Sequence, residues 1–256
     1  MKTGFFVLRK IEIMEQNYNN YTAADHEVWR ILFSRQTENL QDKACPEYMH
    51  CLTQMSDVMH RDAIPDFCKM DELLMQTVSW QIEVVPGHIP VRDFFELLAQ
   101  RRFPSSTWLR PITQLDYLEE PDMFHDIYGH IPLLMDPRYA DFMHAFGQLG
   151  HKYIDNEKAV SALRSLYWFT IEFGLLVSQG KRRIYGAGIL SSYGESKSIY
   201  HHETMLHPFS IRRILETEFR TDVMQSQYFV AESMDEFLQC LKVTKDVLHH
   251  LPVVMT

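Results

Sequence analysis

The sequence predicts a mainly α-helical fold with a small β component, built as a single domain. Three observations support this: apolar residues recur at helical spacing behind capping residues, only short stretches alternate as strands do, and no linker interrupts the chain. The 256 residues, 46% of them hydrophobic and 12% aromatic, can bury a substantial core. We therefore expect one domain over residues 1–256.

Start signals for helices stand at Thr22, Asp136 and Ser233. Threonine, aspartate and serine side chains can accept a hydrogen bond from the first turn of a helix, and apolar residues at helical spacing follow each of these three. The aspartate precedes a proline, which is favoured at the first helical position, and the serine precedes a glutamate by three residues, as in a capping box. We predict a helix after each signal.

Strand signals are fewer. Residues 80–85 alternate between polar and apolar side chains and end at Pro86-Gly87, which predicts a short strand. Residues 211–219 and 228–230 are weaker candidates for strands.

A helix is predicted from about Val160 to Ser178, ended by Gly180, and its second half is apolar on every side. Glu172 lies in this buried half. An ionised carboxylate without a partner there would be strongly unfavourable, so the chain has to supply a cation. A bound metal ion meets this need; an arginine from elsewhere in the chain is the alternative, because Arg164 is too distant along the helix to reach.

Two histidines, His125 and His130, stand five residues apart. On a regular α-helix, side chains at this spacing are rotated by about 140° and cannot both face one ion. We therefore expect the helix to end between them, at Gly129 and Pro132, so that the second histidine turns back beside the first. Two histidines with one carboxylate, here Glu172, form the ligand set of non-heme iron(II) oxygenases.

Composition excludes several classes of protein. A net charge of −9, with only isolated basic pairs, argues against binding nucleic acid. No apolar run is long enough to cross a membrane, and the first residues do not form a signal peptide. The four cysteines lack the spacing of zinc or redox motifs, which predicts free thiols in a reducing compartment. We expect a soluble, cytoplasmic protein.

Three long motifs, at residues 120–132, 166–175 and 183–195, resemble those of the pterin-dependent aromatic amino acid hydroxylases, in the same order. Shorter matches extend the resemblance over roughly residues 20 to 240. It implies the catalytic domain of that family, with Fe(2+) and tetrahydrobiopterin or a related tetrahydropterin as cofactors. It further implies phenylalanine 4-monooxygenase activity, which converts L-phenylalanine and O2 to L-tyrosine.

The resemblance also assigns residues. The positions that match the family's iron ligands are His125, His130 and Glu172. The positions that match its pterin contacts are Gly87, Ile89, Phe94 and Asp126. The positions that match its substrate contacts are Arg110, Pro121, Asp122, Trp168 and Ser191. Tyr167 matches a tyrosine close to the iron.

Other functions stay open at this point. Trp168 favours phenylalanine or tyrosine as substrate over tryptophan, so a tyrosine hydroxylase of the same family is the nearest rival and a tryptophan hydroxylase is less favoured. A metal-dependent hydrolase could use the same three ligands around zinc. The chain has no segment that matches the family's regulatory domain or tetramer-forming tail, so we expect a monomer that binds only small molecules.

Overall fold

The computed structural model describes residues 14–116, 118 and 120–250. The α-helices are α1 (Ala23–Leu40), α2 (Pro46–Gln54), α3 (Phe67–Val78), α4 (Val91–Ala99), α5 (Ile131–Leu134), α6 (Pro137–Lys152), α7 (Glu157–Tyr167), α8 (Ala187–Leu190), α9 (Glu195–Ser198), α10 (Ile211–Glu216) and α11 (Met234–His249). The strands are β1 (Gln81–Val84), β2 (Arg102–Ser105), β3 (Leu175–Ser178), β4 (Lys181–Ile184), β5 (Met205–Pro208) and β6 (Gln227–Ala231). Two π-helical segments, η3 (His125–His130) and η4 (Trp168–Glu172), and two 3-10 turns, η1 (Tyr18–Asn20) and η2 (Ile112–Gln114), complete these elements.

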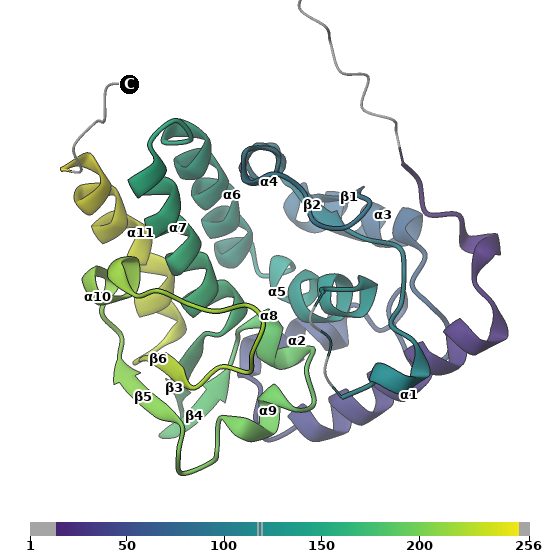
Figure 1. Cartoon of the computed structure of the whole chain (residues 1–256). Helices are drawn as coiled ribbons and strands as arrows, with labels where there is room; N and C mark the ends of the chain where they lie inside the picture. The colour runs from purple at the N-terminus through teal and green to yellow at the C-terminus, as the bar shows by residue number, and fades with distance from the viewer. Residues whose placement is uncertain (1–13, 117, 119, 251–256) are drawn as a thin grey trace, which may run out of the picture.

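Helices dominate the structure, and the strands form two small sheets on different sides of it (Figure 1). The larger sheet has the order β4-β3-β6-β5, with β3 and β4 antiparallel and the other neighbours parallel. The smaller sheet is the parallel pair β1 and β2. The prediction of a mainly α fold with a small β component is confirmed.

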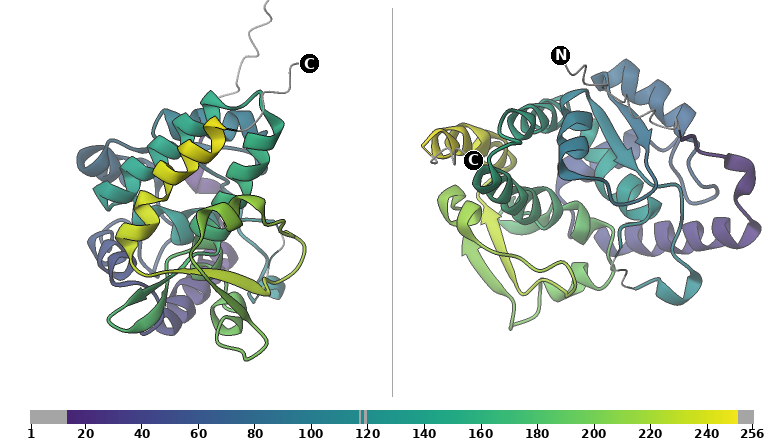
Figure 2. Two further views of the ribbon diagram at one scale, coloured as in Figure 1. Left: turned by 90° about the vertical axis from the view of Figure 1, so that its left-hand side faces the viewer. Right: turned by 45° about the horizontal axis from the view of Figure 1, so that its top comes forward.

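The long helices α6, α7 and α11 lie together above the larger sheet, and α11 runs obliquely across the other two in Figure 2. Helix α4 packs closely on α6, because Gly147 has no side chain where α6 meets it: a Cβ there would lie 2.4 Å from the backbone nitrogen of Ala99. One contiguous cluster of buried apolar side chains extends from Val28 to Leu248. No helix in the described part of the chain is both long and apolar enough to span a bilayer.

The predicted start signals are confirmed. Thr22 and Asp25 form a reciprocal capping box at α1. The side chains of Asp136 and Ser233 accept backbone hydrogen bonds at the starts of α6 and α11. The predicted strands at residues 80–85 and 228–230 correspond to β1 and β6. All four cysteines have free thiols, as expected.

The predicted helix from Val160 to Ser178 is wrong from Phe173 onward. Helix α7 ends at Tyr167, η4 follows to Glu172, and the chain then enters β3. Gly180 does not end a helix but lies in the turn of the β3–β4 hairpin, with φ +70°. The error has a simple cause: the strand begins with the buried residues Leu175 and Leu176, and a continuous apolar run is equally compatible with a buried helix and a buried strand.

The predicted strand at residues 211–219 is also wrong, because residues 211–216 form helix α10. Its buried residues are Ile211, Ile214 and Leu215, which is helical spacing. No sequence pattern predicted β2, β3, β4 or β5, each only four residues long.

Candidate metal centre and active site

Both segments that carry the predicted metal ligands are π-helical. His125 begins η3 and His130 ends it, and Glu172 is the last residue of η4. The hydrogen bonds of a π-helix join residues five apart, so side chains at i and i+5 come to lie on nearly the same face. The expected helix end between the histidines is therefore wrong: the chain continues through Gly129 into α5, and the wider turn brings the imidazoles together.

The three predicted ligands converge on one point. The Nε2 atoms of His125 and His130 are 3.2 Å apart. The Glu172 carboxylate lies 3.1 Å from Nε2 of His130 and 3.6 Å from Nε2 of His125. Three ligands bound at right angles with bonds of about 2.1 Å would lie about 3 Å from one another, so these separations suit one ion. No other such group of histidine, cysteine or carboxylate side chains is present in the described residues.

A hydrogen bond fixes the orientation of His125. The Ser191 hydroxyl donates to the carbonyl of Ala187 at 2.8 Å, so its oxygen accepts from Nδ1–H of His125 at 2.9 Å. The proton on Nδ1 leaves the lone pair of Nε2 directed at the site, as metal-binding histidines require. His130 is held by packing against Phe103, with ring centroids 4.8 Å apart.

The electrostatics also favour a bound cation. Burial opposes ionisation of Glu172, but His130 and His125 together hold its pKa well below the usual range. Burial lowers the pKa of His130, which keeps that imidazole neutral. For His125, burial acts in the same direction, but Glu172 outweighs it and raises the pKa. The alternative partner for Glu172, an arginine, is not found among the described residues: its ion pairs there are with the two histidines.

A cavity of about 1000 Å³ opens beside these ligands. Its lining includes every predicted site residue except Asp122, namely Gly87, Ile89, Phe94, Arg110, Pro121, His125, Asp126, His130, Tyr167, Trp168, Glu172 and Ser191. Further residues line the cavity that were not predicted from the sequence, among them Arg164, Glu195, Phe219, Thr221 and Val223. Phe219, Thr221 and Val223 stand in a loop without a motif, whereas Glu195 ends the motif at residues 183–195 but was given no role there.

Asp122 lies behind the cavity wall and is fully buried. Its carboxylate accepts hydrogen bonds from Nε and Nη2 of Arg110 at 2.8 and 2.7 Å, and from the Arg110 backbone N–H at 2.9 Å. This bidentate pair fixes the guanidinium plane. Nη1 of Arg110 has no partner among the described residues, so the cavity receives one positive, donor-bearing nitrogen.

The other predicted contacts lie around the opposite walls. Phe94, on α4, packs edge to face against Tyr167 with ring centroids 5.2 Å apart. Gly87 has φ +147°, a conformation that other residues rarely adopt. Asp126 accepts a hydrogen bond from the backbone of Ser106 at 2.8 Å, and burial raises the pKa of this carboxyl to about 7.

Trp168 forms an aromatic wall with two neighbours. Its ring stacks on Phe219 at 4.7 Å, with 17° between the planes, and lies 4.6 Å from Phe173. Its indole N–H donates to Oε1 of Gln225 at 3.0 Å. Neither Phe219 nor Gln225 was anticipated from the sequence.

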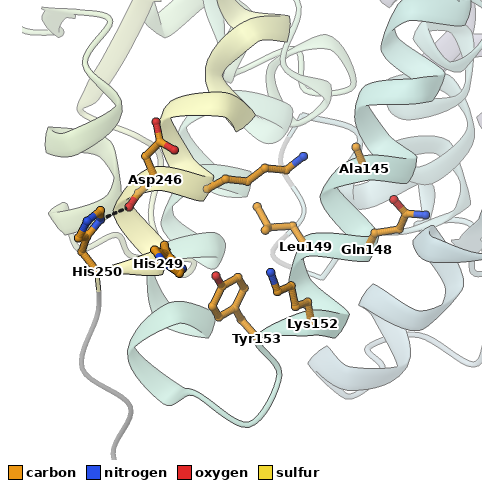
Figure 3. A pocket seen from close by; sticks show the side chains of 9 residues that line it. Ala145, Gln148, Leu149, Lys152, Tyr153, Asp246, His249 and His250 are labelled. Atoms are coloured by element: carbon orange, nitrogen blue, oxygen red, sulfur yellow. Dashed lines mark hydrogen bonds between the residues drawn. The ribbon is translucent and has the colours of Figure 1, made fainter.

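A second, smaller hollow of about 480 Å³ lies between the C-terminal ends of α6 and α11 (Figure 3). Its lining includes Lys152, Lys245 and His249 and none of the predicted site residues. Basic side chains are favoured at helix C-termini because they complement the helix dipole, so these need no ligand to explain them. The larger cavity is the candidate active site.

Two histidines and one carboxylate on one side of an ion, facing an aromatic-lined cavity, define a non-heme metal centre of the oxygenase type. Comparison with known proteins agrees. The pattern of the biopterin-dependent aromatic amino acid hydroxylases matches residues 13–252. The chain belongs to this family.

Individual relatives share most of the chain. Phenylalanine-4-hydroxylase of Ralstonia nicotianae is 44% identical over 238 residues, which cover 92% of this chain and 74% of that one. The crystal structure of Chromobacterium violaceum phenylalanine hydroxylase with bound iron(III) and the oxidized cofactor 7,8-dihydrobiopterin has a TM-score of 0.84 at 41% identity, covering 94% of this chain and 88% of that one. Tyrosine 3-monooxygenase of Schistosoma mansoni is 30% identical over 226 residues, covering 87% of this chain and 48% of that one.

Proposed function

We propose that this chain is an iron(II)- and tetrahydropterin-dependent monooxygenase that converts L-phenylalanine and O2 to L-tyrosine. The observation that carries the proposal is the convergence of three metal-type donor atoms on one point in the wall of an aromatic-lined cavity. Arg110 lies in the same wall and presents a nitrogen that is unpaired among the described residues. Family membership and the relatives that are named phenylalanine-4-hydroxylase support the choice of reaction.

The donor set suits iron(II) in particular. Imidazole nitrogen and carboxylate oxygen both bind iron, and three ligands on one face leave the other positions for small molecules. We assign these ligands as His125, His130 and Glu172, with Tyr167 close to the ion. When bound, iron(II) and a reduced pterin supply dioxygen activation and two electrons.

The side chains of the protein would bind and orient the substrate. Arg110, with its plane fixed by Asp122, would hold the substrate carboxylate through Nη1, and Ser191 would make a second contact near that end. Trp168 and Pro121 would enclose the aromatic ring. Fixing both ends of the substrate would aim one ring carbon at the metal. The protein would thus accelerate the reaction by orienting the substrate rather than by acid–base chemistry.

The pterin site would lie along a different wall. Phe94 would stack against the flat pterin ring, while Gly87 and Ile89 would contact it through the backbone. Asp126 would reach it through water. An aromatic, partly closed cavity also limits the access of bulk water to the reaction.

Product analysis tests the proposal directly. The purified protein is incubated with phenylalanine, tyrosine or tryptophan together with ferrous ion, oxygen and a tetrahydropterin. We expect tyrosine to form from phenylalanine in step with pterin oxidation, and faster than either other product forms. Stronger turnover of tyrosine would favour the rival substrate, while zinc in protein purified without added metal, with no pterin-dependent oxygen consumption, would favour a hydrolase.

We also propose that residues 1–256 act as one catalytic domain, as a monomer, in the cytoplasm, without nucleic-acid or membrane partners. The contiguous buried cluster supports a single domain. The free cysteines support a cytoplasmic location, and the net charge of −9 argues against a nucleic-acid partner. Size-exclusion chromatography with light scattering tests the monomer, and a dimer or tetramer at micromolar concentration would contradict it.

A further inference from the structure

The segment between α10 and β6, residues 217–226, forms part of the wall around the substrate end of the cavity. We call it the 217–226 loop; it crosses from α10 to β6 in Figure 1. Phe219, Thr221 and Val223 of this loop line the cavity. None of residues 218–225 makes a backbone-to-backbone hydrogen bond with another described residue. Side chains must therefore hold the loop in place.

Gln225 makes most of the hydrogen bonds that hold the 217–226 loop. It is 9% exposed and is the one buried residue of the 217–226 loop. Its Nε2 donates to the carbonyls of Arg220 and Val223 at 2.9 and 3.3 Å, so the side chain closes the loop on itself. Its backbone N–H donates to the buried carboxylate of Glu195 at 3.0 Å, which ties the loop to α9.

The same side chain also fixes the aromatic wall. Oε1 of Gln225 accepts the indole N–H of Trp168, the only hydrogen-bond donor of that side chain. A rotated indole would lose this bond and leave a polar group unpaired in a partly buried site. Phe219 stacks on the same ring. Gln225 therefore joins Trp168 and the loop into one rigid wall.

We propose that Gln225 is a positioning residue that sets the ring selectivity of the enzyme, because it fixes the indole of Trp168 and the 217–226 loop relative to one another. The inference rests on the proposed function and names a determinant of its specificity. In this proposal, the fixed wall favours a single aromatic ring in the pocket. Without Gln225, the indole and the loop separate, contacts with a single ring weaken, and a fused ring gains room.

The first test replaces Gln225 by leucine, which keeps the bulk and removes the side-chain hydrogen bonds. Gln16→Leu is the matched control, because Gln16 also bridges segments, with bonds to Pro65 and Phe67, but does not line the cavity. We expect Gln225→Leu to raise KM for phenylalanine about fivefold, as the loss of about one hydrogen bond would, with little change in kcat. The ratio of kcat/KM for phenylalanine to kcat/KM for tryptophan should fall in the same variant.

A double-mutant cycle separates positioning from a general loss of stability. Trp168→Phe removes the indole N–H and keeps an aromatic ring, so Gln225→Leu should change KM and selectivity much less in that background than in the native one. Equal effects in both backgrounds would overturn the inference, as would an unchanged KM and selectivity in Gln225→Leu. Gln225→Met, unbranched and adaptable, takes its place in the cycle if the leucine variant does not fold.

The controls distinguish the two possible failures. If the native protein forms no tyrosine from phenylalanine, the proposed function fails. If it does form tyrosine and Gln225→Leu has the selectivity of the native protein, only the role of Gln225 fails. Equal loss of selectivity in Gln16→Leu would assign the effect to stability and would also overturn the inference.

Discussion

The hydroxyl of Tyr48 donates to the backbone carbonyl of Tyr128 at 2.7 Å, in the interior of the protein. In a regular helix this carbonyl would accept from the residue four positions later, which is Pro132 and has no N–H. A side chain from α2 thus supplies the donor that the proline lacks. The helix can then continue from η3 into α5 with its buried carbonyl paired, and His130 keeps its place at the metal centre.

Tyr48→Phe should therefore weaken the metal centre as well as the fold. The buried carbonyl of Tyr128 would lose its partner, which costs about 1–3 kcal/mol of unfolding free energy. Denaturation in urea measures this loss, and competition with a chelator measures metal affinity. Tyr18→Phe is the control, because its hydroxyl also donates to a backbone carbonyl, that of Ile64, away from the site. Equal metal affinity in the two variants would refute the link to the metal centre.

Ser191→Ala removes the acceptor that orients His125. Loss of such a partner typically reduces metal affinity by about 10- to 100-fold, because the imidazole no longer holds the correct tautomer and orientation. Metal affinity measured by chelator competition checks this without relying on activity. Thr244→Val removes a buried hydroxyl that bonds within α11, and we expect that variant to bind metal as the native protein does. A Ser191→Ala protein with native affinity would show that packing alone orients His125.

Arg110→Lys tests the proposed grip on the substrate carboxylate. Lysine keeps the charge but not the planar fork that bonds Asp122 twice, so the cation would no longer be held in one orientation. We expect KM for phenylalanine to rise by about tenfold or more with a smaller effect on kcat. Arg102→Lys alters a more exposed pair with Glu83 and should leave KM unchanged. A native KM in Arg110→Lys would contradict this role.

The pH dependence of stability should change in Glu195→Gln. Burial raises the pKa of Glu195 above its ordinary value, although Tyr228, Gln225 and Ser198 donate hydrogen bonds that act in the opposite direction. The folded protein thus binds this proton more tightly than the unfolded chain does. The associated stability is present below the ordinary pKa and is lost as pH rises through the folded-state value. Glutamine does not titrate, so unfolding measured from pH 4 to pH 7 should show the variant gaining stability relative to the native protein as pH rises; a constant difference would contradict the assignment.

Much of the site could be predicted from sequence. Glu172 could be recognised as a ligand because a carboxylate in an apolar run needs a cation, and the structure places it beside two imidazoles. The helix starts at Thr22 and Asp136 could be predicted because capping is a local property.

The rest depends on features that have no local signature. The spacing of His125 and His130 suggested a broken helix, because a π-helical turn differs from an α-helical one by a single residue per hydrogen bond. Tertiary contacts decide between the two, here including the donor that Tyr48 provides from α2. Gln225 could not be found for the same reason: its partners Trp168 and Glu195 are distant in sequence, and only the fold brings them together.

Metal analysis of Glu172→Ala, purified beside the native protein and assayed for tyrosine formation, is the most direct test that three side chains share one ion. We expect the native protein to hold close to one iron per chain and to form tyrosine from phenylalanine. The variant, which lacks one of three ligands, should hold little iron and form no tyrosine. A Glu172→Ala protein that keeps its iron and its activity would contradict the account.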